Sequence, residues 1–298
     1  MSEAILTTQA AEAPAADAKT KKRRGGKLGV AGWICLVWLV VVMVAAVLAP
    51  WLPIDEPDKT DFFVDNSSSP GVGGHLLGTD QNGFDIFSRL IWGGRVSLVV
   101  ALGVLIIGMS VGGLIGLLAG FFRGRIETVL MSVIDIFLAF PALILLIAIV
   151  AFLGADLENI VVGISLVSIP AFARISRATT LTFSQREFVL AARAAGATNR
   201  RILVREILPN VILPLLAFGL LVVAIAIVAE GALAFLGLTS QETISWGGMI
   251  NGGRRPLQQQ DIAHVALIPA FMMFLTVLAV NFLGDRFRAV FDVKDAAL

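Results

Sequence analysis

The sequence predicts an all-α integral membrane protein with six transmembrane helices. Of its 298 residues, 57% are hydrophobic and only 15% are charged, whereas soluble domains carry roughly 45–50% apolar and about 25% charged residues. The hydrophobic residues also gather in long stretches without charge. Because a backbone in lipid must satisfy its own hydrogen bonds, these stretches are expected to be helices.

A membrane-spanning helix needs about 20 mainly apolar residues. Five stretches reach this length, one of them interrupted by a single aspartate: 28–52, 96–122, 128–155, 207–229 and 262–284. A sixth, at 159–173, is shorter and contains Pro170. We expect it to span the membrane and to continue beyond it at its arginine end.

The distribution of basic residues supports six spans. With both termini in the cytoplasm, the inner segments hold eighteen of the 23 Lys and Arg residues. This excess is the positive-inside bias of membrane proteins. Without the short fourth span, the arginine-rich segment 174–205 would lie outside. The count therefore predicts six spans and two cytoplasmic termini.

The chain divides into four predicted parts. Residues 1–27 form an Ala-rich polar tail that ends in the basic stretch KKRRGGK, expected to be disordered in the cytoplasm and anchored to membrane lipid. Residues 28–52 are the first transmembrane helix, and 53–92 an acidic extracytoplasmic loop. The core, 93–298, holds five transmembrane helices and a cytoplasmic loop at about 178–210.

Several classes of function are disfavoured. The net charge of +1 does not indicate a nucleic-acid partner, and a single cysteine, Cys35, excludes an intramolecular disulfide. No P-loop pattern occurs, so the chain is not expected to bind ATP through one. The segment GTDQNGFD fails as a calcium loop, because Asp85 and Ile91 stand where an EF-hand needs glycine and glutamate. We expect no metal site.

Four glycines recur at a spacing of four residues in the second span: Gly108, Gly112, Gly116 and Gly120. On a helix they share one face, against which another helix can pack closely. We favour packing within the chain over a subunit interface. Ser110 in the same stretch formally matches a hydrolase nucleophile motif, but that motif requires a strand-turn-helix context. An intramembrane hydrolase is therefore disfavoured.

Two carboxylates, Asp135 and Glu230, lie within predicted spans. Ionisable groups at membrane depth are costly and suggest a translocation pathway. A buried carboxyl hydrogen-bonded between helices is the alternative, and the sequence leaves both open. An ion-coupled secondary transporter would use these carboxylates, but such proteins usually contain inverted repeats, and none is evident.

The loop at about 178–210 is rich in helix-forming residues and is divided by Gly196. Interpreted as two short helices, it places an apolar face inside a basic rim. The face consists of Phe188, Ala191, Ala192 and Ala195, and the rim of Arg186, Arg193, Arg200 and Arg201. Such an element suits docking into a protein groove. We favour docking over a helix that lies on anionic lipid.

This loop resembles the EAA loop of bacterial ABC importer permeases, specifically the dipeptide/oligopeptide (Dpp/Opp) C-type subunits. That pattern is Glu-Ala-Ala, three residues, Gly, nine residues, Ile, any residue, Leu-Pro. The matching residues are Ala191, Ala192, Gly196, Leu208 and Pro209. Leu190 stands in place of the usual glutamate and Glu206 in place of the isoleucine, while Glu187 lies one helical turn earlier.

Three further segments resemble the same family. The segment before the second span matches at Gly78, Thr79, Asp80, Gly83, Asp85, Ser88, Arg89, Gly93, Arg95, Ser97 and Leu98, with Phe84 in place of the usual arginine. The stretch AEGALAFLGL at 229–238, followed by SWGGMI, is the second. The last resembling segment lies in the third span and contains Asp135 and Phe140-Pro141.

The resemblance implies a type I importer permease of the bacterial inner membrane that is not itself an enzyme. It implies a homologous second permease, two cytoplasmic ATPase subunits that carry ATP and Mg, and an extracytoplasmic substrate-binding protein. The substrates would be di- or oligopeptides, although glutathione, nickel complexes and haem also fall within the family. The implied ATPase-coupling residues are Arg186, Glu187, Ala191, Ala192, Arg193, Gly196, Ala197, Arg200, Arg201, Leu208 and Pro209.

Overall fold

The computed structural model describes residues 29–60, 68–240, 243–254 and 262–295. Within these ranges the regular structure is helical, and the β pairing consists of two isolated antiparallel bridges, Thr60 with Phe84 and Thr79 with Asp85. The predicted tail at 1–27 lies outside the described residues.

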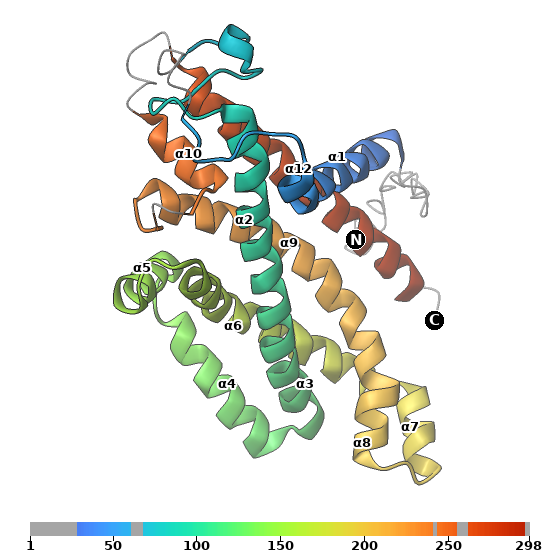
Figure 1. The fold of residues 1–298 in the computed structure, drawn as a ribbon. Helices are drawn as coiled ribbons and strands as arrows, with labels where there is room; N and C mark the ends of the chain where they lie inside the picture. The colour runs from blue at the N-terminus through green and yellow to red at the C-terminus, as the bar shows by residue number, and fades with distance from the viewer. Residues whose placement is uncertain (1–28, 61–67, 241–242, 255–261, 296–298) are drawn as a thin grey trace, which may run out of the picture.

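Five long helices form the body of the molecule (Figure 1): α1 (Gly29–Leu48), α2 (Ile86–Ile107), α6 (Leu157–Phe183), α9 (Leu208–Phe235) and α12 (His264–Asp295). The shorter helices are α3 (Gly113–Phe122), α4 (Gly124–Leu138), α5 (Ala142–Leu153), α7 (Glu187–Ala194), α8 (Asn199–Arg201) and α10 (Trp246–Gly252). Short 3-10 turns lie at Ala49–Trp51 and Val72–Gly74, and π-helical segments at Gly108–Gly112 and Ile202–Ile207 join α2 to α3 and α8 to α9.

The predicted spans correspond closely to these helices. Five continuous helical segments are long and apolar enough to cross a membrane: Gly29–Trp51, Ile86–Phe122, Leu157–Phe183, Asn199–Phe235 and His264–Ala289. The short fourth span is confirmed, because α6 is a helix of 27 residues that passes through Pro170 and continues beyond Arg174.

The third span differs from its prediction as one helix over 128–155. The chain forms α4 and α5 there, which are bent by 84° relative to each other and count as one span only if the bent pair crosses the membrane together. Proline explains the break, since it disfavours the helical conformation of the preceding residue and lacks the N–H that a continuing helix needs. The helix accordingly stops before Pro141, and α5 begins directly after it.

The glycine face of α2 and α3 packs within the chain, as predicted. A Cβ atom on Gly112 would lie 2.5 Å from the Ile169 carbonyl oxygen, and one on Gly116 would lie 2.1 Å from the Ala173 carbonyl oxygen. The Ser176 hydroxyl donates a hydrogen bond to the Gly113 carbonyl at 2.6 Å. The backbones of α3 and α6 are therefore in direct contact.

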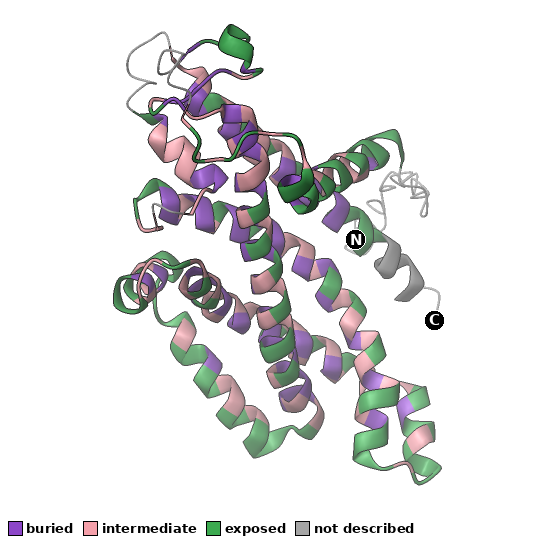
Figure 2. Cartoon of the chain, viewed as in Figure 1, coloured by how far each residue is buried: buried purple, intermediate pink, exposed green. Residues whose placement is uncertain are grey.

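The buried residues lie where the long helices cross, and the outer helices are mostly exposed (Figure 2). Among its 20 residues, α1 buries only Gly32, Val42 and Ala46, and α4 buries only Ile134. Large apolar side chains of both helices face outwards. An exposed apolar surface of this extent is suited to contact with lipid or with another subunit.

We predict that Gly116→Ala destabilises the protein by about 1–3 kcal/mol, because the added methyl group overpacks a contact with the backbone of α6. Thermal unfolding of the purified protein in detergent micelles measures the effect. Gly113→Ala on the same helix is the matched control, since its Cβ would meet only the flexible end of Leu215 at 3.3 Å. Equal melting temperatures for the two variants would contradict the prediction.

Candidate functional site

The loop at 178–210 forms a helical hairpin that protrudes at one end of the molecule (Figure 1). α6 ends at Phe183, and α7 and α8 follow after short turns. Gly196 has a φ of +79°, in the left-handed region that glycine adopts without strain, with open space where a Cβ atom would be. Thr198 caps α8 by accepting a hydrogen bond from the Arg201 N–H at 3.4 Å. The local sequence thus sets the turn between α7 and α8.

α7 is held by one apolar side chain and exposes others. Val189 is fully buried in the core, and α7 packs against the π-helical segment Ile202–Ile207. Phe188 is 41% exposed and Leu190 is 53% exposed. The hairpin therefore offers an apolar outer surface that nothing in the described chain covers.

The four arginines of the predicted rim lie in the same hairpin. Arg193, Arg200 and Arg201 are exposed, while Arg186 is half-buried at the start of α7. Of the predicted apolar face, Ala191 and Ala195 are exposed, but Ala192 is half-buried. The other predicted coupling residues lie in the same hairpin: Glu187 and Pro209 are exposed, and Ala197 and Leu208 are half-buried.

Glu230 is buried inside the chain, at 2% exposure. Its carboxylate accepts a hydrogen bond from the Ser97 hydroxyl of α2 at 3.1 Å, and the Ser245 hydroxyl also hydrogen-bonds it. Ser245 caps α10 by accepting from the Gly248 N–H at 3.1 Å. Glu230 thus connects α9 to both α2 and the start of α10.

Trp246 reinforces the contact between α10 and α2. Its indole N–H donates a hydrogen bond to the Leu90 carbonyl at 2.9 Å, and the side chain is fully buried. Gly93 and Gly94 of α2 make room for it, since a Cβ atom on Gly94 would lie 2.9 Å from the Trp246 ring. The SWGG segment is therefore fixed to α2 by close packing and hydrogen bonds together.

Asp135 lies in a different environment from Glu230. It forms an ion pair with Arg174 of α6 at 2.8 Å, and the two side chains are 59% and 57% exposed. Nearer the start of α4, Glu127 pairs with Arg177, whose Nε donates to Oε1 at 2.7 Å. Two ion pairs thus join α4 to α6 on a face that the described chain leaves open.

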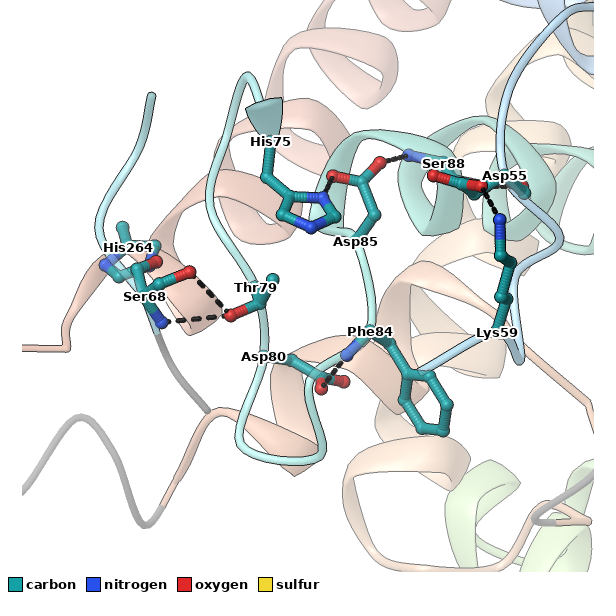
Figure 3. A network of polar contacts seen from close by, with 10 residues as sticks. All are labelled: Asp55, Lys59, Ser68, His75, Thr79, Asp80, Phe84, Asp85, Ser88 and His264. Atoms are coloured by element: carbon teal, nitrogen blue, oxygen red, sulfur yellow. Dashed lines mark hydrogen bonds and ion pairs between the residues drawn. The ribbon is translucent and has the colours of Figure 1, made fainter. Parts of the chain in front are cut away.

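At the end of the molecule opposite the hairpin (Figure 1), the polar motif before α2 folds into a loop at 75–85, the capped loop, whose polar contacts are shown in Figure 3. Asp85 caps α2 by accepting from the Ser88 N–H at 2.7 Å, and it also bonds His75 Nδ1 at 2.9 Å. Asp80 accepts from the Asn82 and Phe84 N–H groups and pairs with Arg89.

The remaining motif residues complete this loop. Thr79 is buried and bonds Ser68, while His264 at the start of α12 bonds the Ser68 carbonyl at 3.2 Å. Gly78 and Gly83 have φ values of +81° and +79°. Arg95 is exposed on α2 with its guanidinium over the Trp92 ring. Most of this motif therefore builds the loop, and the sequence alone did not show which residues pair.

Some partners were not predicted. Arg174 directly follows the predicted fourth span, and the need to balance a carboxylate within the third span could have suggested its pairing with Asp135. Ser97 lies 133 positions before Glu230, so no local pattern connects them. Among the described residues there is no cluster of three His, Cys, Asp or Glu side chains that could hold a metal ion. Ser110 lies in a π-helical turn of a continuous helix, which does not provide a nucleophile elbow.

A bundle of long apolar helices, with an amphipathic hairpin at one end and a capped polar loop at the other, defines a multi-pass membrane permease. Residues 112–294 match the family described as the binding-protein-dependent transport system inner membrane component, and the chain belongs to this family. It is a multi-pass inner-membrane transport component that works with other subunits and is not an enzyme. Family membership sets aside the secondary transporter and the hydrolase.

Similar proteins agree with this assignment. The chain is 36% identical over 266 residues to a glutathione transport system permease protein of Pectobacterium atrosepticum, covering 89% of this chain and 86% of that one. It is 39% identical over 274 residues to a putative peptide transport system permease protein of Brucella suis, covering 92% and 89%. A structure of the MetNI methionine ABC transporter in an inward-facing conformation shares its fold, with a TM-score of 0.57 at 20% identity over 68% of this chain and 96% of that one.

We predict that Glu230→Leu destabilises the protein by about 1–3 kcal/mol for each serine hydroxyl left without its partner. Glu230→Gln keeps a hydrogen-bond acceptor of the same shape, and it should lower the free energy of unfolding much less. Thermal unfolding in detergent micelles distinguishes the two variants. A leucine variant as stable as the glutamine variant would show that the carboxylate does not hold α9, α2 and α10 together.

Proposed function

We propose that this chain is the permease subunit of an ATP-driven importer that moves di- or oligopeptides across the inner membrane. Both termini face the cytoplasm, with the α7–α8 hairpin on that side and the capped loop outside. The similarity to permeases named for glutathione and peptide transport supports the substrate class. The observation that carries the proposal is the exposed apolar surface of α7 at the protruding end.

The hairpin couples the permease to a separate ATPase subunit. An exposed short helix with apolar residues and an arginine rim fits a groove on a protein partner. ATP and Mg bind to the two ATPase subunits and not to this chain. Leu190, which is exposed, takes the place of the glutamate found in similar loops, so its contact with the ATPase is apolar.

A homologous second permease completes the membrane part. The open face of α4 and α6 carries the exposed Asp135–Arg174 ion pair. Asp135 stands eleven residues after the first residue of α4, about 16 Å along the helix. An ion pair within a membrane-spanning segment is too costly to face lipid tails. We therefore assign this face to the second permease and to a water-filled pathway between the two subunits.

The surroundings of Glu230 indicate a role different from that of Asp135. Its burial and its two serine partners favour positioning of α10 over direct contact with substrate. The pathway prediction from the sequence is therefore retained for Asp135, together with Arg174. An extracytoplasmic binding protein would deliver substrate to the loop end of the molecule.

Reconstitution of the chain with its co-purifying subunits in proteoliposomes tests the proposal. We predict uptake of a radiolabelled dipeptide or of glutathione that requires ATP and the binding protein. Vesicles loaded with a non-hydrolysable ATP analogue are the control and should show no accumulation. Uptake that proceeds without ATP, driven by an ion gradient, would refute the importer assignment.

We predict that Ala191→Arg reduces the uptake per ATP hydrolysed at least about tenfold, because a charged side chain at the centre of a protein interface costs roughly 2 kcal/mol or more. Parallel measurements of ATP hydrolysis and uptake in proteoliposomes provide the ratio. Ala289→Arg adds the same charge to an exposed position of α12 and should leave the ratio unchanged. An unaltered ratio in Ala191→Arg would exclude α7 as the coupling element.

A further inference from the structure

A cavity of about 650 Å³ opens at the end of the molecule opposite the hairpin. Its walls come from four parts of the chain that are distant in sequence: the segment after α1, the capped loop with the first turn of α2, the end of α9 with the α9–α10 connection and α10, and the start of α12. Sites for small molecules usually enclose about 300–1,000 Å³. The cavity is thus large enough for a ligand of a few residues.

The wall offers both signs of charge together with neutral polar groups. Asp58 and Asp80 supply carboxylates and Arg89 supplies a guanidinium. Three carboxamides, Gln81, Asn82 and Asn251, can each donate and accept hydrogen bonds. Hydroxyl side chains of Thr239, Ser240 and Thr243 also belong to the wall. This mixture matches a zwitterion that contains amide bonds better than an apolar ligand.

Arg89 retains unused hydrogen-bonding capacity. Its guanidinium lies 4.3 Å from the centre of the Phe84 ring and pairs with Asp80, and the side chain is only 16% exposed. Its Nε is buried without a hydrogen-bond partner among the described residues. A guanidinium has five N–H donors, so one carboxylate neighbour leaves donors for a second carboxylate.

The cavity is also built on a fixed base. Asp80 shapes the loop wall through its bonds to the Asn82 and Phe84 N–H groups, at 2.8 Å and 3.1 Å. Ala234 in the wall lies one helical turn after Glu230, and Ile244 directly precedes Ser245. The buried Glu230 cluster therefore supports the base of the cavity. A preformed polar site of this kind binds with little reorganisation.

We propose that this cavity is a substrate subsite on the permease itself, and that it takes a short peptide from the extracytoplasmic side. Asp58 receives the ammonium group, the carboxamides bond the peptide groups, and Arg89, held beside Asp80, faces the carboxylate. The substrate class rests on the proposed function, whereas the site is argued from its walls.

Protection of a cysteine in the wall tests the subsite directly. The permease complex, in nanodiscs and without binding protein, carries Cys35→Ser and Thr243→Cys, or Asn251→Cys if the first variant does not fold. We expect saturating alanylalanine to slow the reaction with a charged, membrane-impermeant thiol reagent at least about threefold, as for a pocket that buries most of its ligand. N-acetyl-alanylalanine, which lacks the ammonium group, should protect less.

Two matched variants in one loop distinguish peptide binding in the cavity from a general effect of removing a negative charge. Asp58→Asn removes a carboxylate from the wall and should raise the alanylalanine concentration for half-protection about two- to fivefold, the range for a partly exposed ion pair. Glu56→Gln removes a carboxylate two residues earlier, outside the wall, and should not change it. A cysteine at Glu56 should react at the same rate with and without peptide.

The outcomes distinguish this inference from the proposed function, because labelling requires neither ATP nor uptake. ATP-driven uptake without any protection by peptide would overturn the subsite and leave the importer standing. Protection without ATP-driven uptake would keep the site and refute the importer. Protection that occurs only when the binding protein is added would overturn the subsite, because a protein contact would then fill the cavity.

Discussion

The arrangement of this bundle depends on the backbone contact between α3 and α6. A side chain at Gly116 would collide with the Ala173 carbonyl, so the close approach of the two helices requires glycine at this position. α3 continues α2, which begins at the capped loop, and α6 leads to the α7 hairpin. A single contact between small residues therefore positions the elements at both ends of the molecule.

Charged groups are used differently in the interior and on the open face. Glu230 is enclosed by Ser97 and Ser245, where its hydrogen bonds offset the cost of burial. Asp135 is half-exposed and is balanced by Arg174. Two carboxylates that look equivalent in the sequence thus have separate tasks. One holds α9, α2 and α10 together, and the other marks the surface that we assign to the pathway.

The sequence predicted those features that depend on local pattern. Apolar length and the charge count placed the spans, and the spacing of Gly112, Gly116 and Gly120 predicted a close helix contact. The bend of 84° at Pro141 was missed, because hydropathy records the polarity of a stretch and not its direction. The bonds between Ser97 and Glu230, and the walls of the cavity, join residues from distant segments. Only the folded chain brings them together.

The helical segment Asn199–Phe235 runs without interruption from the hairpin to the wall of the cavity. Its 37 residues correspond to a rod of about 55 Å. A rod that is clamped near its far end by Glu230 and loaded near its first turn acts as a lever. If the hairpin docks on an ATPase as proposed, a small tilt imposed there would change the width of the cavity in the same motion, so release of a bound ligand and nucleotide binding would share one mechanical step.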